Sequence, residues 1–184
     1  MLVRTVVVFL LSAATAAGDD RSLKIVPSKA LPAIESVSVY PSGGAKPLVT
    51  LTTFAAAVPL PGDGPFDVFV NPKGGIPVRV AAKLDVKAGA THDLKLGDLL
   101  GTVEVIPSDD SPRAGKVVVT AADDPGPDEK GHVAVQTGSD YRVELAVPGG
   151  FYAVWVVPAS GARAVRVADR VRVLPGRAAR VGGE

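Results

Sequence analysis

Two groups of charged residues have the types and spacing that could bind a ligand, and the first of them is acidic. Its members are Asp109, Asp110, Asp123, Asp124, Asp128 and Glu129. Carboxylates gathered on loops suit a hard cation such as Ca²⁺, which takes about six to eight oxygen ligands. Here the order Asp-Asp-Pro-Gly-Pro-Asp-Glu departs from the usual calcium-loop spacing, and the two prolines restrict how the carboxylates can converge. A solvated loop is the simpler interpretation, and calcium is its alternative.

The second group is basic and lies near the C-terminus. It comprises Arg163, Arg166, Arg170 and Arg172. From position 170 to 173 arginine alternates with valine, so a strand there would carry its guanidinium groups on one face. Such a face could hold a carboxylated or phosphorylated polymer of the cell envelope through bidentate contacts. A solvated outer face explains the same pattern more simply, and both interpretations remain open.

Catalytic chemistry finds little support in the sequence. There is no cysteine, and the two histidines, His92 and His132, belong to no His-x-His or His-Glu-x-x-His motif. Ser139 and Asp140 follow His132 closely, but no Gly-x-Ser-x-Gly motif is present. Neither of the glycine-rich phosphate loops occurs. We therefore predict a protein that is not an enzyme and has no cofactor, with a hydrolase as the least favoured alternative.

Composition excludes other classes. The chain has 184 residues, 20 basic against 19 acidic groups, and 47% hydrophobic residues. A net charge of +1 gives no electrostatic reason to expect nucleic acid as a partner. Intrinsic disorder of the whole chain is excluded because so apolar a sequence can bury a core.

The first 18 residues are typical of a secretory signal peptide. Arg4 precedes an apolar run that ends in small residues, with cleavage expected between Ala16 and Gly18. The apolar run is short for a membrane span, so we expect no integral span after cleavage; an uncleaved anchor is the alternative. A secreted, periplasmic or cell-envelope location follows.

The remaining chain alternates apolar and polar residues with period two, which is typical of strands. Clear cases are 36–40 and 102–106, and further runs include 66–70 and 141–147. Pro-Gly and Gly-Gly turns separate these runs about every 8 to 12 residues, a spacing that indicates sandwiches or barrels. No convincing helix is visible.

The chain also resembles itself. The run 36–42 can be aligned with 102–108, 66–72 with 152–158, and 84–89 with 171–176. In this alignment the second copy carries an insertion in the region 109–136. We predict two tandem modules, 33–97 and 101–182, preceded by an extended segment 19–32. The first is small enough to be marginal alone, so we expect the modules to pack together through the leucines of the link 97–101. One merged sandwich or barrel is the alternative.

The repeated block is an aromatic-x-Val-x-Val strand after Pro-Gly, a glycine-rich turn, and Val-x-Val-x-x-Gly. It resembles the transthyretin-like and carboxypeptidase-regulatory-like modules, and the related PEGA-type modules, of exported bacterial proteins. The resemblance rests on 61–70 with 84–96 and on 148–156 with 171–181. It implies small antiparallel β-sandwiches, Ig-like or transthyretin-like, with a non-catalytic role in adhesion, spacing or support.

The resulting hypothesis is an exported structural or interaction protein of the bacterial envelope or extracellular space. Its partner would be a protein or a polymer, bound through loops or strand edges. A carbohydrate- or calcium-dependent adhesin is the first alternative, and a hydrolase with a cleft between the modules is the second.

Overall fold

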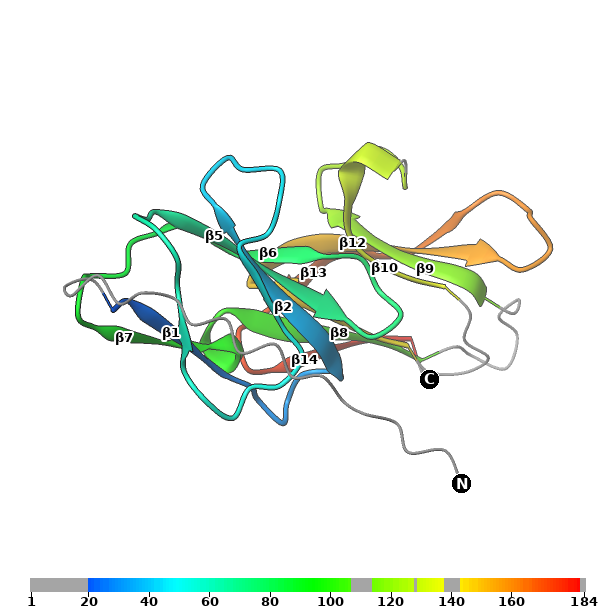
Figure 1. Ribbon diagram of the computed structural model, residues 1–184. Coiled ribbons are helices and arrows are strands. Elements are labelled where there is room, and N and C mark those ends of the chain that lie inside the picture. The colour runs from blue at the N-terminus through cyan, green and yellow to red at the C-terminus, as the bar shows by residue number, and fades with distance from the viewer. Residues whose placement is uncertain (1–19, 107–113, 128, 138–142, 183–184) are drawn as a thin grey trace, which may run out of the picture.

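The computed structural model describes residues 20–106, 114–127, 129–137 and 143–182, and these residues form strands almost throughout (Figure 1). The only helical elements among them are two short 3-10 turns, η1 (Leu96–Asp98) and η2 (Glu129–Gly131). The predicted signal peptide, residues 1–18, lies outside the described residues. The predicted all-β class is confirmed.

Each half of the chain contributes one three-stranded and one four-stranded sheet. The strands of the first half are β1 (Ser22–Val26), β2 (Ile34–Pro41), β3 (Val49–Leu51), β4 (Val58–Pro59), β5 (Phe66–Pro72), β6 (Val78–Leu84) and β7 (Thr91–Lys95). Those of the second half are β8 (Leu100–Ile106), β9 (Ala114–Ala121), β10 (His132–Thr137), β11 (Val143–Pro148), β12 (Gly150–Pro158), β13 (Val165–Val173) and β14 (Ala178–Gly182).

The two halves have the same topology. The sheet orders are β4-β1-β7 with β3-β2-β5-β6 in the first module, and β11-β8-β14 with β10-β9-β12-β13 in the second. In both modules the first strand pairs in parallel with the last, β1 with β7 and β8 with β14, and all other pairs are antiparallel. The expected antiparallel sandwiches are therefore found, with one parallel pair in each that the sequence did not indicate.

The hairpins β5-β6 and β12-β13 correspond closely, as the alignment predicts. Both contain two register shifts between their strands. In both, one residue of the second strand has a left-handed backbone: Lys83 with φ 52° and Arg170 with φ 48°. Such a conformation is uncommon outside glycine, and its recurrence at matching places identifies a shared β-bulge.

The alignment of 36–42 with 102–108 is wrong. β2 lies in a four-stranded sheet beside β5, whereas β8 lies in a three-stranded sheet beside β14. The counterpart of β8 is β1, and the counterpart of β2 is β9. The segment 19–32, expected to be merely extended, thus contains a paired strand. No large insertion is needed either, since β1 and β2, like β8 and β9, are separated by seven residues.

Each sandwich has its own apolar core. Val37, Val68 and Val70 are fully covered in the first module, and Val103, Val119 and Val154 are fully covered in the second. On β5 the buried residues alternate strictly with partly exposed ones. This period-two burial is the pattern from which the strands were predicted.

The modules pack against each other through the outer face of the sheet β11-β8-β14. Leu100 and Ala146, both from the second module, belong to the core cluster of the first. Thr102 Oγ1 donates a hydrogen bond to the carbonyl of Ala30 over 2.9 Å. An isolated bridge joins Gly75 to Gln136, and no described strand of one module pairs within a sheet of the other. The expected intermodule contact is confirmed, and a merged sheet is not observed.

Asp67 holds the bulge of the first module in place. Its Oδ1 accepts the backbone N–H of Lys83 over 2.8 Å, and its Oδ2 accepts that of Gly43 over 3.4 Å. These hydrogen bonds favour the ionised carboxylate, and the Lys83 bond is the main reason that the pKa of Asp67 lies below its usual value of 3.8.

We expect Asp67→Asn to lower stability at neutral pH but not in strong acid. Because the folded pKa is depressed, the stabilising contribution is present above the unfolded pKa and disappears as the pH falls through the folded pKa. Urea midpoints of the wild type and the variant, measured from neutral to strongly acidic pH, should therefore converge. A difference that stays constant across this range would contradict the role of the carboxylate.

Candidate partner-binding surface

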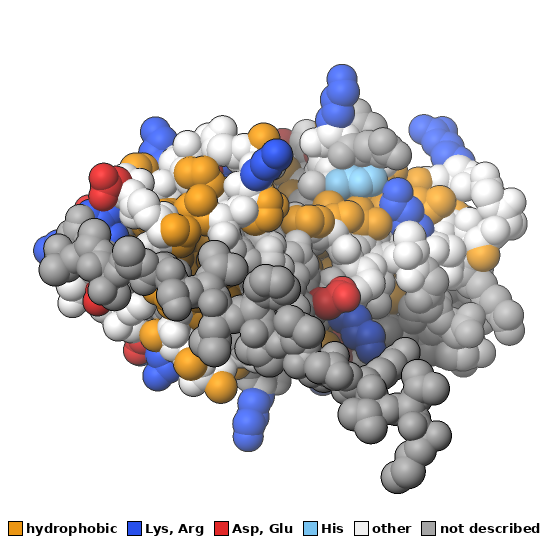
Figure 2. Space-filling view, viewed as in Figure 1, with side chains coloured by type: hydrophobic (Ala, Val, Ile, Leu, Met, Phe, Trp, Pro, Cys, Tyr) orange, Lys and Arg blue, Asp and Glu red, His pale blue; other side chains and the backbone are white. Residues whose placement is uncertain are grey.

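The second module exposes apolar and cationic side chains together along one margin. Four of the five large exposed hydrophobic residues described lie between positions 151 and 174: Phe151, Val165, Val167 and Leu174. Figure 2 shows one face of the molecule, on which hydrophobic side chains form a band with Lys and Arg projecting around it. By strand register, Phe151 and Leu174 lie toward one end of β13, and Val165 and Val167 lie toward the other. Exposed apolar side chains that lie together are a common sign of a binding surface.

Phe151, Arg170 and Arg172 form a compact group on this margin, which we call the arginine cluster. Phe151 is 51% exposed and lies directly opposite Arg172 on the neighbouring strand. The guanidinium carbon of Arg170 lies 5.7 Å from the centre of the Phe151 ring. An accessible aromatic ring beside two guanidinium groups can contact apolar and anionic parts of one partner at once.

The bulge in β13 is what brings the arginine cluster together. Between the pairs Tyr152–Val171 and Val154–Ala168, β13 has one residue more than β12. The backbone at Arg170 is left-handed, and this conformation accommodates the extra residue. β13 is also the edge strand of its sheet, so its second side pairs with no described strand. A bulged edge resists continuous pairing with another chain, so binding here depends on side chains.

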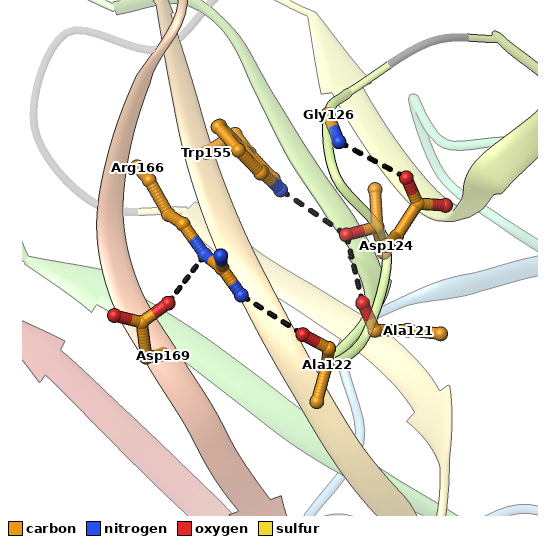
Figure 3. A network of polar contacts seen from close by, with 8 residues as sticks. Ala121, Ala122, Asp124, Gly126, Trp155, Arg166 and Asp169 are labelled. Carbon is orange, nitrogen blue, oxygen red and sulfur yellow. Dashed lines mark hydrogen bonds and ion pairs between the residues drawn. The ribbon is translucent and has the colours of Figure 1, made fainter.

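Arg166 belongs to a different environment. Its guanidinium lies over the ring of Trp155 at 5.2 Å, donates to the carbonyl of Ala122 over 2.9 Å and forms an ion pair with Asp169 (Figure 3). These contacts engage Arg166 within the protein, linking β13 to the loop that follows β9. The candidate arginines are therefore divided: Arg166 supports the structure, while Arg170 and Arg172 are exposed.

Arg163 is exposed in the turn between β12 and β13, at the opposite end of β13 from Arg172. The sequence predicts a guanidinium-lined strand face for positions 170–173, and the structure has exposed arginines at 170 and 172. There Val173 is buried and Arg172 exposed, which is the alternation that the sequence indicates.

Trp155, the only tryptophan of the chain, is buried, with 8% of its surface exposed. It does not lie between the two sheets, however. With Val118, Val135 and Ala153 it forms a separate cluster on the opposite face of the sheet from Val154. Its Nε1 donates to Thr120 Oγ1 over 3.1 Å. Phe69 has the equivalent position in the first module but is only half-buried.

The acidic residues show no convergence where they are described. The Asp124 carboxylate accepts the N–H of Gly126 over 3.1 Å and so shapes its own loop, while its neighbour Asp123 is exposed. Asp109, Asp110 and Asp128 lie outside the described residues, as do Ser139 and Asp140. Glu129 begins η2. Within the described part of the chain, no three His, Asp or Glu side chains are arranged to hold a metal ion. The calcium alternative remains a prediction.

The histidines lie in different modules and on different sheets. His92 lies on β7 opposite Leu23, and His132 begins β10. The Nε2 atom of His132 lies 3.1 Å from the carbonyl oxygen of Pro127, a contact between the residues on either side of η2.

Sequence reasoning missed Phe151. Its signal was the spacing Phe151, Ala153, Trp155, which places the three residues on one face of a strand. That pattern could not show that Trp155 would be covered and Phe151 exposed, because the covering comes from other elements. It also missed the polar face of β2 and β5, described below.

The fold thus defines a protein of two tandem β-sandwich modules. No family model and no curated protein matches the chain. Among solved structures it is similar to the Bacillus anthracis TIE protein, with 18% sequence identity and a TM-score of 0.30; the match covers 88% of this chain and 33% of that one. Among the described residues, no helix is long and apolar enough to cross a membrane.

Proposed function

We propose that this protein is an exported, non-catalytic binding protein of the bacterial envelope or the extracellular space, and that an anionic polymer binds at the arginine cluster. The observation that carries the proposal is the exposed Phe151 ring, with Arg172 opposite it and Arg170 against it. Guanidinium groups bind carboxylate and phosphate in a bidentate manner, and an adjacent apolar ring can contact the uncharged parts of a polymer. The resemblance to exported accessory modules supports the same role.

Two features of the fold support this proposal. The modules share a buried interface, so the second module, which carries the arginine cluster, is held in place by the first. The bulged edge of β13 also favours recognition by side chains over addition of a further strand. The predicted signal peptide would bring the protein into contact with envelope polymers.

The arginine cluster is tested with the double variant Arg170→Asn/Arg172→Ser. Asparagine tolerates the left-handed backbone at position 170, so the fold should be kept while both charges are removed. We expect binding to immobilised alginate or polyphosphate to weaken about tenfold or more, because charge-assisted contacts are lost. Wild-type binding should also weaken as salt is raised.

Lys83→Asn is the matched control, since Lys83 has the same left-handed bulge position in the first module. It should leave binding to both polymers unchanged. If the control and the double variant lost affinity equally, the loss would be due to net charge and not to the arginine cluster.

Export is tested separately. The protein is taken from the envelope or medium of an expressing bacterium, where its mass should show cleavage between residues 16 and 18. A chain retained in the cytoplasm would contradict export.

A further inference from the structure

The outer face of the first module carries a connected row of polar side chains. Thr50 Oγ1 lies 3.3 Å from Ser38 Oγ, across the pair β3-β2. Asn71 Nδ2, on β5, donates to Ser38 Oγ over 3.3 Å and to Ser36 Oγ over 2.7 Å. Both amide hydrogens of Asn71 are therefore used, which fixes the orientation of its side chain and leaves its Oδ1 as an acceptor with no partner among the described residues.

An aromatic pair adjoins this row. The rings of Tyr40 and Phe69 meet edge to face, with centroids 5.2 Å apart and an interplanar angle of 74°. Both residues are half-buried. Phe69 lies directly opposite Ser38, and Ser36 lies opposite Asn71, so the rings and the polar row occupy neighbouring positions on one face.

The second module shows that the fold does not require this composition. By strand register, Ser38 corresponds to Val118, Asn71 to Val157 and Phe69 to Trp155. Val118, Val157 and Trp155 form or contact an apolar cluster, and Val118 and Trp155 are buried there. The same sheet face is thus apolar in the second module and polar and aromatic in the first. In the first module Ser38 is buried, whereas Ser36, Tyr40, Phe69 and Asn71 are partly exposed and Thr50 is exposed.

Charged residues lie at the margin of this face, beside the polar row. Asp67 lies opposite Tyr40 on β5, and Arg79 lies opposite Phe69 on β6. Arg79 is near enough to contribute to the lowered pKa of Asp67, after the hydrogen bond from Lys83. Lys83, whose backbone N–H bonds to Asp67, is an exposed cation at the same margin. The polar row itself consists of uncharged side chains, so the contacts that it offers suit a neutral partner.

We propose that this face binds a neutral oligosaccharide. A pyranose ring has an apolar side of C–H groups, which suits the Tyr40 and Phe69 rings, and hydroxyl groups that can donate to Asn71 Oδ1 and accept from Ser36. Because internal hydrogen bonds already hold the row, little side-chain freedom is lost when the sugar binds. This site is separate from the arginine cluster, which lies in the other module and takes anions.

Affinity electrophoresis of the full chain tests the proposal. Native gels contain, one at a time, a soluble α-glucan, a β-glucan, a galactomannan or a xylan. We expect at least one of these neutral polymers to retard the protein. Tyr40→Leu keeps apolar bulk but removes the flat ring, and Asn71→Ala removes the amide acceptor. Each should raise the dissociation constant about tenfold. Thermal melting identifies any variant that fails to fold. If one variant does not fold, the proposal is tested with the other.

Arg172→Ser is the control and should not alter this retardation. No retardation by any neutral polymer, or retardation unchanged in both folded variants, would overturn the proposal. So would retardation that only Arg172→Ser abolishes, because it would assign the sugar to the arginine cluster. Failure of alginate and polyphosphate to bind would overturn the proposed function alone and leave the neutral-sugar site standing.

Discussion

Gly101→Ala should destabilise the protein by about 3 kcal/mol, since forcing extra volume into a closely packed site is strongly unfavourable. Gly101 lies on β8, and a Cβ placed there would collide with the carbonyl oxygen of Leu174. It would also lie 2.5 Å from Val173 Cγ1 and 2.9 Å from the carbonyl oxygen of Arg177. Two of these three obstacles are backbone atoms, which cannot move aside by a change of rotamer.

Gly126→Ala provides the control because no heavy atom lies within 4 Å of the place that its Cβ would take, and its φ is not in the left-handed region. We expect a change within about 0.5 kcal/mol there. Urea unfolding followed by circular dichroism measures both variants. If Gly101→Ala unfolds at the same urea concentration as the wild type, the close approach of β8 to the turn 174–177 is incorrect.

Strands with several buried residues were predictable. β2, β5, β8 and β9 each contain three or more covered side chains, so their apolar alternation is visible in the sequence. β7 and β14 each bury one residue, Leu94 and Val181, and are defined by parallel pairing with distant strands. β4 has only two residues. A single sequence window does not contain the partner that makes such segments strands.

The mistaken alignment has a related cause. Ser36–Ser42 and Thr102–Ser108 look alike because both encode an apolar-alternating strand followed by proline. That pattern specifies local backbone geometry but not which sheet a strand enters. The hairpins β5-β6 and β12-β13 were matched correctly because aromatic, proline and glycine positions agree along two consecutive strands.

The arginine cluster was predictable only in part. Residue type and alternation indicated a cationic strand, and Arg172 lies where that pattern places it. The contact between Arg170 and Phe151 depends on the bulge, whose left-handed residue is an arginine where glycine would be the usual signal. The position of Arg166 over Trp155 depends on the loop after β9, which the sequence does not place.

Trp155→Ala should cost about 3 to 4 kcal/mol of stability, at the level of other buried large-to-small aromatic substitutions. Trp155 is 8% exposed, packs against Val118 and Ala153, and also holds Arg166 over its ring. Its removal leaves a cavity and deprives Thr120 Oγ1 of the indole donor. The loop after β9 loses support as well, because Arg166 is oriented toward Ala122 partly by the ring.

Phe69→Ala is the matched comparison, at the equivalent position of the first module. Phe69 is half-buried on an open face, so its truncation should cost about 1 to 2 kcal/mol, in proportion to the smaller area that it removes from water. Circular dichroism in urea measures both, since the chain has a single tryptophan and Trp155→Ala removes its fluorescence. Equal costs at the two positions would mean that both faces are covered to the same extent. Equal costs would also contradict the partial exposure of Phe69, on which the proposed neutral-sugar site depends. This pair of variants therefore tests the difference between the two modules before any ligand is added.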